Sequence, residues 1–206
     1  MDEKLKRQVI EGLSRYENSI KEIDEHYDEL KLYGRYSPVA PYGSKHLLPF
    51  WIHLLEEEGI ECEGFRAEYT RISWKLTALE EKWGRDYRDK LFAALKRDID
   101  HYPTVICYFA YSVMSLELEI PNDLSFRSEI EILLMELKRD FDLTEIKTMV
   151  ASLDEVLKCI YMREIKEIVK IFDYYSKTED RSYPDRFWWQ HPLKILEEKQ
   201  AMLTGS

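Results

Sequence analysis

The stretch PTVICYFAYSVMSLEL, from Pro103 to Leu118, carries no charge before Glu117 and would present apolar side chains on every face of a helix. A helix that is apolar all round belongs in the interior of a protein. The first half of the stretch also has the β-branched and aromatic residues of a buried strand. Sixteen residues without a turn are nevertheless long for a strand, and a membrane span needs about 20. Pro103 suits a first helical position, where its missing N–H is not needed. We therefore expect a buried central helix over about residues 102–118.

A heptad seam predicts a helix at residues 2–31. Its apolar residues recur with spacings of 4, 3, 4, 3, 4 and 3, at Val9, Leu13, Tyr16, Ile20, Ile23, Tyr27 and Leu30. Such a seam is typical of a coiled coil and also of a long helix inside a bundle. Tyr16 and Tyr27 occupy positions where a two-stranded coil prefers aliphatic residues. We therefore expect the seam to be buried within the chain, with a self-associating helix as the alternative.

The same periodicity outlines the rest of the chain. Further helices are predicted at 49–58, 64–83, 86–102, 125–140 and 153–177, with a short last helix from Pro192 to about Met202. The predicted fold class is all-α: an irregular bundle of about seven or eight helices around the central helix. We expect one domain over residues 1–206.

Several residues mark where these helices should begin and end. Gly84 is placed as a C-cap residue would be. Asp142 with Glu145, and Ser152 with Glu155, have the spacing of capping boxes, and each pair predicts a helix start. Residues 32–44 contain two prolines and two glycines and predict a loop.

The composition indicates a cytoplasmic, soluble protein. The chain has a net charge of -10 and a pI near 5.1, which disfavours nucleic acid or an anionic membrane as the partner. Its first residues lack the apolar region of a signal peptide, and its three cysteines form no CxxC pair. Five Asn and Gln residues stand against 70 Asp, Glu, Lys and Arg residues. This imbalance is typical of thermophiles and gives the chain an archaeal-like composition.

Two histidine and carboxylate pairs are weak candidates for metal ligands. His53 lies three residues before Glu56, and Asp98 lies three residues before His101, so each pair shares one face of a helix. Ferritin-like di-iron bundles use Glu-x-x-His pairs, whereas here one pair is reversed and the other has Asp for Glu. Such pairs also arise by chance among 40 acidic residues and five histidines. We therefore predict no metal site and no cofactor, and keep a metal-dependent helical enzyme as an alternative.

Arg97 and His101 form a second candidate pair, four residues apart along a predicted helix. The pair resembles that of the HEPN ribonucleases, in which an Arg and a His on one helix act on the RNA phosphate at a dimer interface. This resemblance implies a ribonuclease with these two residues as its catalytic pair. The family's motif has a longer spacing, and an ion pair near the helix end is the ordinary alternative. The sequence has no G-x-S-x-G or Walker A motif.

Aromatic residues in two predicted loops favour an interaction role. Consecutive indoles point in different directions, so we expect that Trp188 and Trp189 do not both enter one core easily. Aromatic residues with Arg are common anchors of protein interfaces. The candidate interaction residues are Tyr36, Tyr183, Arg186, Trp188 and Trp189. We predict a protein–protein interaction, regulatory or scaffold domain that binds another protein or itself, unless this loop folds back onto the bundle.

Overall fold

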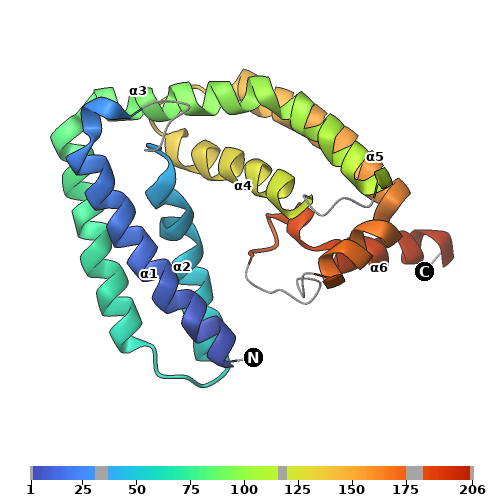
Figure 1. Ribbon diagram of the computed structural model, residues 1–206, viewed down its shortest axis with the longest axis horizontal. Coiled ribbons are helices and arrows are strands. Elements are labelled where there is room, and N and C mark those ends of the chain that lie inside the picture. Colours follow the sequence, from blue (N-terminus) through green and yellow to red (C-terminus); the bar gives the residue numbers. More distant parts are fainter. Residues whose placement is uncertain (1, 31–36, 116–119, 175–182, 205–206) are drawn as a thin grey trace. The chain divides into compact units, whose positions relative to one another are not determined.

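Every regular element in the described part of the chain is helical. The computed structural model describes residues 2–30, 37–115, 120–174 and 183–204. Its helices are α1 (Asp2–Glu25), α2 (Ala40–Glu57), α3 (Glu63–Ser115), α4 (Ile120–Leu137), α5 (Thr144–Tyr174) and α6 (Pro192–Thr204), with single turns at η1 (Tyr27–Glu29) and η2 (Trp188–Gln190) (Figure 1). The predicted all-α class is confirmed, with six α-helices in these residues instead of seven or eight. None of these helices has both the length and the apolar character needed to cross a membrane.

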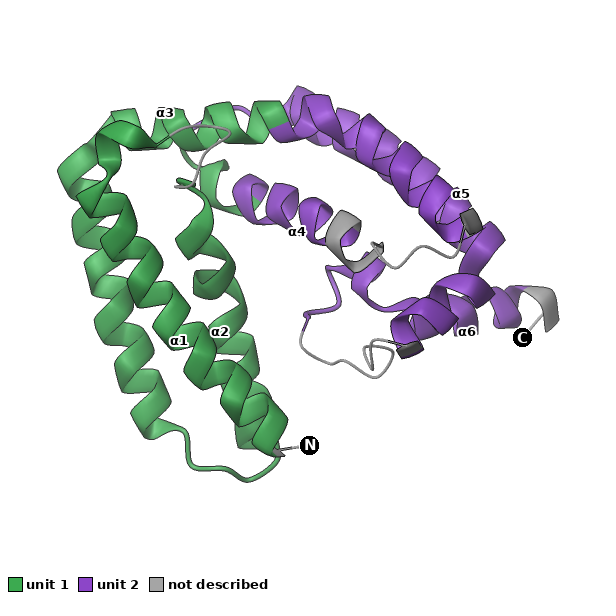
Figure 2. Cartoon of the chain, viewed as in Figure 1, with its two compact units in different colours: residues 1–97, 135–140 green, residues 98–134, 141–206 purple. Residues whose placement is uncertain are grey.

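The chain divides into two compact units (Figure 2). Unit 1 comprises residues 1–97 and 135–140, and unit 2 comprises residues 98–134 and 141–206. Helices α3 and α4 contribute to both units. The expectation of a single domain stays a prediction.

In unit 1, α1 runs parallel to the first part of α3 (Figure 1). Arg71 donates to Glu17 over 2.8 Å and Lys82 donates to Asp24 over 2.6 Å, so residue numbers rise together along both helices. All seven seam residues are buried, although α1 ends at Glu25 and not at residue 31, so that Tyr27 and Leu30 lie beyond it. The prediction that this seam is satisfied inside the chain is therefore confirmed.

Helix α2 packs closely on α1 in the same unit. A Cβ atom at Gly12 would lie 2.9 Å from side-chain atoms of both Leu48 and Trp51, so only glycine permits this approach without a shift. Helix α2 begins nine residues before the predicted start, and residues 40–44 are therefore helical, not a loop. Pro41 lies in its first turn, where a missing N–H leaves no hydrogen bond unmade.

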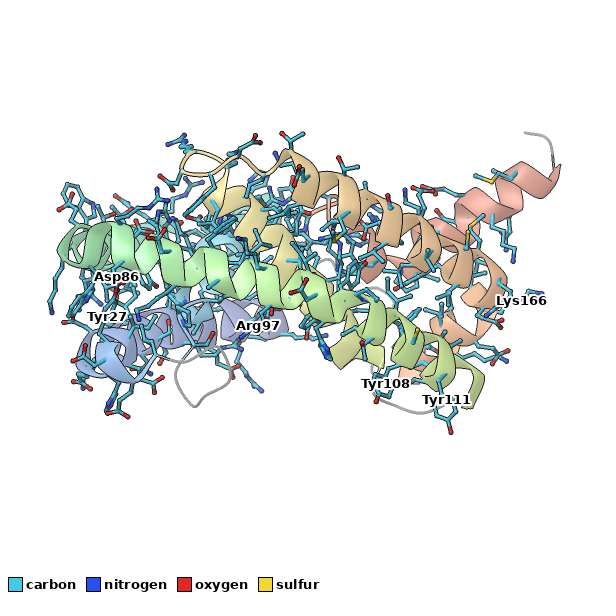
Figure 3. The ribbon with its side chains drawn as sticks, turned by 90° about the horizontal axis from the view of Figure 1, so that it is seen from above. Tyr27, Asp86, Arg97, Tyr108, Tyr111 and Lys166 are labelled. Atoms are coloured by element: carbon cyan, nitrogen blue, oxygen red, sulfur yellow. The ribbon has the colours of Figure 1, made fainter. Side chains whose placement is uncertain are left out.

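Within α3, two helical segments meet at a kink at Gly84, where the sequence predicts that the first of them ends. Gly84 has φ 51° and ψ -130°, a conformation that side-chain-bearing residues rarely adopt. Tyr27 spans the kink: its ring stacks on Trp83 at 3.6 Å, and its hydroxyl donates to Asp86 over 2.5 Å (Figure 3). The predicted break at Pro103 is wrong, since Pro103 lies inside α3. Long helices accept an interior proline by bending or by losing one hydrogen bond.

In unit 2, the second part of α3 runs parallel to α5. Tyr102 donates to Asp154 over 2.7 Å, and the rings of Phe109 and Tyr161 stack with centroids 5.4 Å apart, so both contacts have the same sequence offset. Helix α4 contacts α5 through Arg127, whose guanidinium donates to the same Asp154 carboxylate that accepts from Tyr102.

One of the two predicted capping boxes marks a real helix start. Asp142 accepts hydrogen bonds from the backbone N–H and the hydroxyl of Thr144, the first residue of α5. Ser152 lies inside α5 and donates to the carbonyl of Thr148, so the second predicted start is wrong. A serine inside a helix can donate to the carbonyl of the preceding turn, and the sequence alone does not distinguish such a serine from one at a helix start. Pro192 begins α6, as predicted.

Candidate functional site

One side of the apolar stretch in α3 lies open to solvent. Pro103, Thr104, Cys107, Tyr108 and Tyr111 are exposed, as is His101 just before the stretch. We call His101, Thr104, Cys107, Tyr108 and Tyr111 the α3 strip. Tyr108 is 62% exposed and Tyr111 is 56% exposed. Figure 3 shows both tyrosines projecting from the same side of α3. The expectation that residues 102–118 are buried on every face is therefore wrong for this side of the helix.

The opposite side of α3 anchors the strip in unit 2. Its buried residues are Tyr102, Val105, Ile106, Phe109, Ser112 and Val113. Phe109 stacks on Tyr161, and the Tyr102 hydroxyl is held by Asp154. Burial and the nearby Asp154 carboxylate raise the pKa of Tyr102 well above its ordinary value, so this hydroxyl stays protonated and keeps donating. The strip is thus presented by a helix that is fixed from behind.

The strip offers apolar area with few polar groups. A shallow hollow of about 590 Å³ is lined by Pro103, Thr104, Cys107, Tyr108 and Tyr111. None of these five residues carries a formal charge at neutral pH. At the end of the strip nearer the N-terminus, the ring of His101 meets Phe126 of α4 edge-on at 5.6 Å. Tyrosines in uncharged surroundings are typical of the core of a protein interface.

Trp189, which the sequence suggests as an interaction residue, is buried in the structure. Trp189 is 1% exposed, and its indole Nε1 donates to Ser128 Oγ over 3.0 Å. The Tyr161 hydroxyl donates to the Trp189 carbonyl. The Arg127 guanidinium lies 4.1 Å from the Trp189 ring centroid. This indole is therefore part of the interior of unit 2.

The other predicted interaction residues lie at different depths. Trp188 is half-buried, with its ring edge-on to Tyr161 at 5.6 Å. Tyr183 is also half-buried and lies against Phe187, whereas Arg186 is exposed and covers the Phe187 ring. Tyr36 lies outside the described residues. The consecutive indoles thus both pack on unit 2, which is the alternative that the sequence left open.

Arg127 and Asp154 form a buried ion pair beneath this loop. Arg127 Nε and Nη2 each donate to one Asp154 oxygen over 2.8 Å, and Glu131 accepts further hydrogen bonds at 3.2 Å. Although burial alone would lower the pKa of Arg127, the Asp154 hydrogen bonds raise it above its ordinary value. Bidentate pairs of this kind fix geometry. The Arg127–Asp154 pair is buried and connects α4 and α5 beneath the Trp189 ring.

A second polar cluster, in unit 1, surrounds Glu136. Lys45 donates to its Oε2 over 2.8 Å, and His46 Nε2 lies 2.5 Å from its Oε1. Arg88 lies beside them and pairs with Asp140 at 2.9 Å. Burial opposes the charge on Glu136, but hydrogen bonds from His46 and Lys45 outweigh it and lower its pKa to about 2. The cluster is a charge network that joins α2 to the end of α4 nearer the C-terminus.

The two candidate pairs of metal ligands belong to different units, and His53 Nδ1 lies 4.0 Å from Glu56 Oε2 within unit 1. His53 lies beside Glu57 on the exposed side of α2, while Glu56 is bound by Arg66. Asp98 is buried and His101 is exposed, so they share no accessible site. Within the described ranges, no group of three His, Cys, Asp or Glu side chains is arranged to hold a metal ion.

The candidate ribonuclease pair lies on one helix, but at unequal depth. His101 is exposed, whereas Arg97, four residues earlier on α3, is half-buried.

No protein-family model, no curated protein and no solved structure matches this chain. The function proposed below therefore depends on the chain's own side chains.

Proposed function

We propose that this chain is a protein-interaction domain and that the α3 strip is its binding face. The single observation that supports this most strongly is the exposure of Tyr108 and Tyr111 on a helix that is packed from behind. Contiguous exposed aromatic side chains rimmed by polar residues are typical of interaction surfaces. Tyrosine supplies a large contact area with few rotatable bonds, so its side chain loses little conformational entropy on binding.

Another exposed aromatic residue, Trp74, has different surroundings from those of Tyr108 and Tyr111. Besides Tyr108 and Tyr111, Trp74 of unit 1 is a strongly exposed aromatic residue in the described part of the chain, at 73% exposure. Its neighbours Thr70, Lys75 and Thr77 on α3 are polar. Single exposed apolar residues are normal on protein surfaces. The strip differs because two tyrosines, a cysteine and a threonine adjoin one another.

The spacing of the strip fits a helical partner. His101, Thr104, Tyr108 and Tyr111 follow one another at intervals of 3, 4 and 3 along α3. Side chains at this spacing form a nearly straight row along a helix, into which a second helix can pack. We therefore propose an α-helix as the element that covers the strip. No observation favours the metal-dependent enzyme or the HEPN-like ribonuclease over this function, and both stay predictions.

Photo-crosslinking tests the proposed binding face. A benzophenone-bearing phenylalanine replaces Tyr108 in one variant and Trp74 in another, and each is irradiated in an extract of cells that naturally make the protein. We expect a discrete adduct from position 108 that is lost when Tyr111→Glu is added, and none from position 74. Unchanged circular dichroism of the Tyr111→Glu variant controls for folding, because an exposed substitution costs little stability. Equal labelling from positions 108 and 74 would contradict the proposal.

A further inference from the structure

We propose that unit 1 contains a carboxylate-binding site, formed by α2 and α3, which the chain itself fills with Glu136. The donors are Lys45 and His46 on α2 and Arg88 on α3. Glu136 is brought to them by residues 135–140, which belong to unit 1, whereas the α3 strip belongs to unit 2. This site is therefore independent of the binding face proposed above.

The carboxylate of Glu136 is bound in the way that proteins bind a carboxylate ligand. Its side chain is 8% exposed, and each of its oxygens has its own donor. Lys45 Nζ donates to Oε2 over 2.8 Å, and His46 Nε2 lies 2.5 Å from Oε1. Hydrogen bonds of this charge-assisted kind are shorter and stronger than neutral ones. Two adjacent residues of one helix thus supply a donor for each oxygen.

Contacts between α2 and α3 hold these donors without any help from Glu136. The Tyr69 hydroxyl on α3 donates to the Lys45 carbonyl over 3.0 Å. The Tyr42 hydroxyl on α2 donates to Glu80 on α3 over 2.7 Å. The Lys45 ammonium also lies 5.1 Å from the centroid of the Tyr42 ring. We therefore expect the donors to keep their positions when the Glu136 carboxylate is removed.

Arg88 has a donor that Glu136, fixed to its own backbone, does not reach. Arg88 Nη2 pairs with Asp140 at 2.9 Å. Arg88 Nη1 is buried and has no hydrogen-bond partner within the described part of the chain, since Glu80 Oε1 is 3.6 Å away and Glu136 Oε2 is 3.9 Å away. Buried donors normally have an acceptor. A carboxylate that is free to move can approach Nη1 more closely.

The ligand that fits this site is a small monocarboxylate. Without Glu136, Arg88 keeps its acidic neighbours, whereas Lys45 and His46 lose the carboxylate that they contact. Leaving one member of a buried ion pair without its partner is strongly destabilising. Acetate is the matching probe, because Glu136→Ala removes the same CH2–COO⁻ group.

Chemical rescue of purified full-length Glu136→Ala tests the proposal. The variant is titrated with sodium acetate at neutral pH, and its thermal unfolding is followed by circular dichroism, with sodium chloride at equal concentrations as the reference. We expect the thermal midpoint to be higher by about 2–5 °C in about 100 mM acetate than in chloride, with a saturating dependence. If the variant is unfolded in chloride, the same titration should show acetate refolding it.

Two further variants serve as matched controls. Glu136→Gln fills the same space with a side chain, so acetate and chloride should affect it alike. Adding Lys45→Met to Glu136→Ala removes one donor and should weaken the response to acetate. Saturation-transfer NMR of the acetate methyl group gives a direct readout, with a signal expected from Glu136→Ala and none from Glu136→Gln.

Three outcomes would overturn the proposal. An equal acetate response in Glu136→Ala and Glu136→Gln would mean that acetate binds elsewhere. A folded Glu136→Ala that responds to acetate as it does to chloride would mean that the donors rearrange onto Glu80 and Asp140. A Glu136→Ala variant that stays unfolded at every acetate concentration would mean that α2 and α3 do not form the site by themselves.

Discussion

At the scale of single residues, Trp189 shows how one side chain can be interpreted in two ways. Its indole is buried, hydrogen-bonded to Ser128 and covered by the Arg127 guanidinium. Truncating a buried tryptophan removes packing and leaves a cavity. Trp189→Ala should therefore lower the free energy of unfolding by about 3–5 kcal/mol in urea denaturation. Trp74→Ala, at an exposed site, should change it by less than about 0.5 kcal/mol. Normal stability of Trp189→Ala together with a lost binding partner would reinstate the loop as an interaction site.

Glu136 makes a pH-dependent contribution to stability. Its folded pKa of about 2 lies below the ordinary value of 4.5, so the ionised form is favoured in the folded state. The contribution is full above pH 4.5 and is lost as pH falls toward 2. At 1.36 kcal/mol per unit, it amounts to about 3 kcal/mol.

Urea unfolding of Glu136→Gln as a function of pH measures this contribution. We expect the variant to be less stable at pH 7 and to lose less stability than the wild type between pH 4.5 and 2. Glu81→Gln, at an exposed position of α3, is the matched control and should follow the wild-type curve. Parallel acid limbs for Glu136→Gln and wild type would show that the carboxylate is not the cause.

At the scale of elements, the bend in α3 depends on the backbone of Gly84. No atom lies within 4 Å of a Cβ added there, so any cost of substitution comes from its positive φ and not from a clash. Gly84→Ala should lower stability by about 1–3 kcal/mol in thermal or urea unfolding. Gly43, in helical α2, also has open space for a Cβ, and Gly43→Ala should raise stability by about 0.5–1 kcal/mol. A stabilising Gly84→Ala would mean that α3 prefers to be straight.

The elements also show where helix boundaries could be predicted. Asp142 and Pro192 act locally, through a cap and a fixed φ, and both mark helix starts as expected. Pro103 and Ser152 carry similar local signals, but both lie inside long helices. Packing along α3 and α5 outweighs one missing or displaced hydrogen bond, and such packing involves residues far away in sequence.

At the scale of the whole molecule, the sequence determined the all-α class and the burial of the apolar seam from Val9 to Leu30. Apolar side chains at helical spacing must be covered, and the seam from Val9 to Leu30 is covered by unit 1. Only the tertiary structure decided which side of the stretch from Thr104 to Val113 faces water, because apolar residues occur on all its faces. Contacts with Asp154 and Tyr161 of α5 select the buried side, which leaves Tyr108 and Tyr111 exposed. Likewise, Trp189 is buried because Ser128 and Arg127, some 60 positions earlier, come to lie against it. Periodicity dictates that a face is buried, whereas the partner that buries it comes from distant parts of the chain.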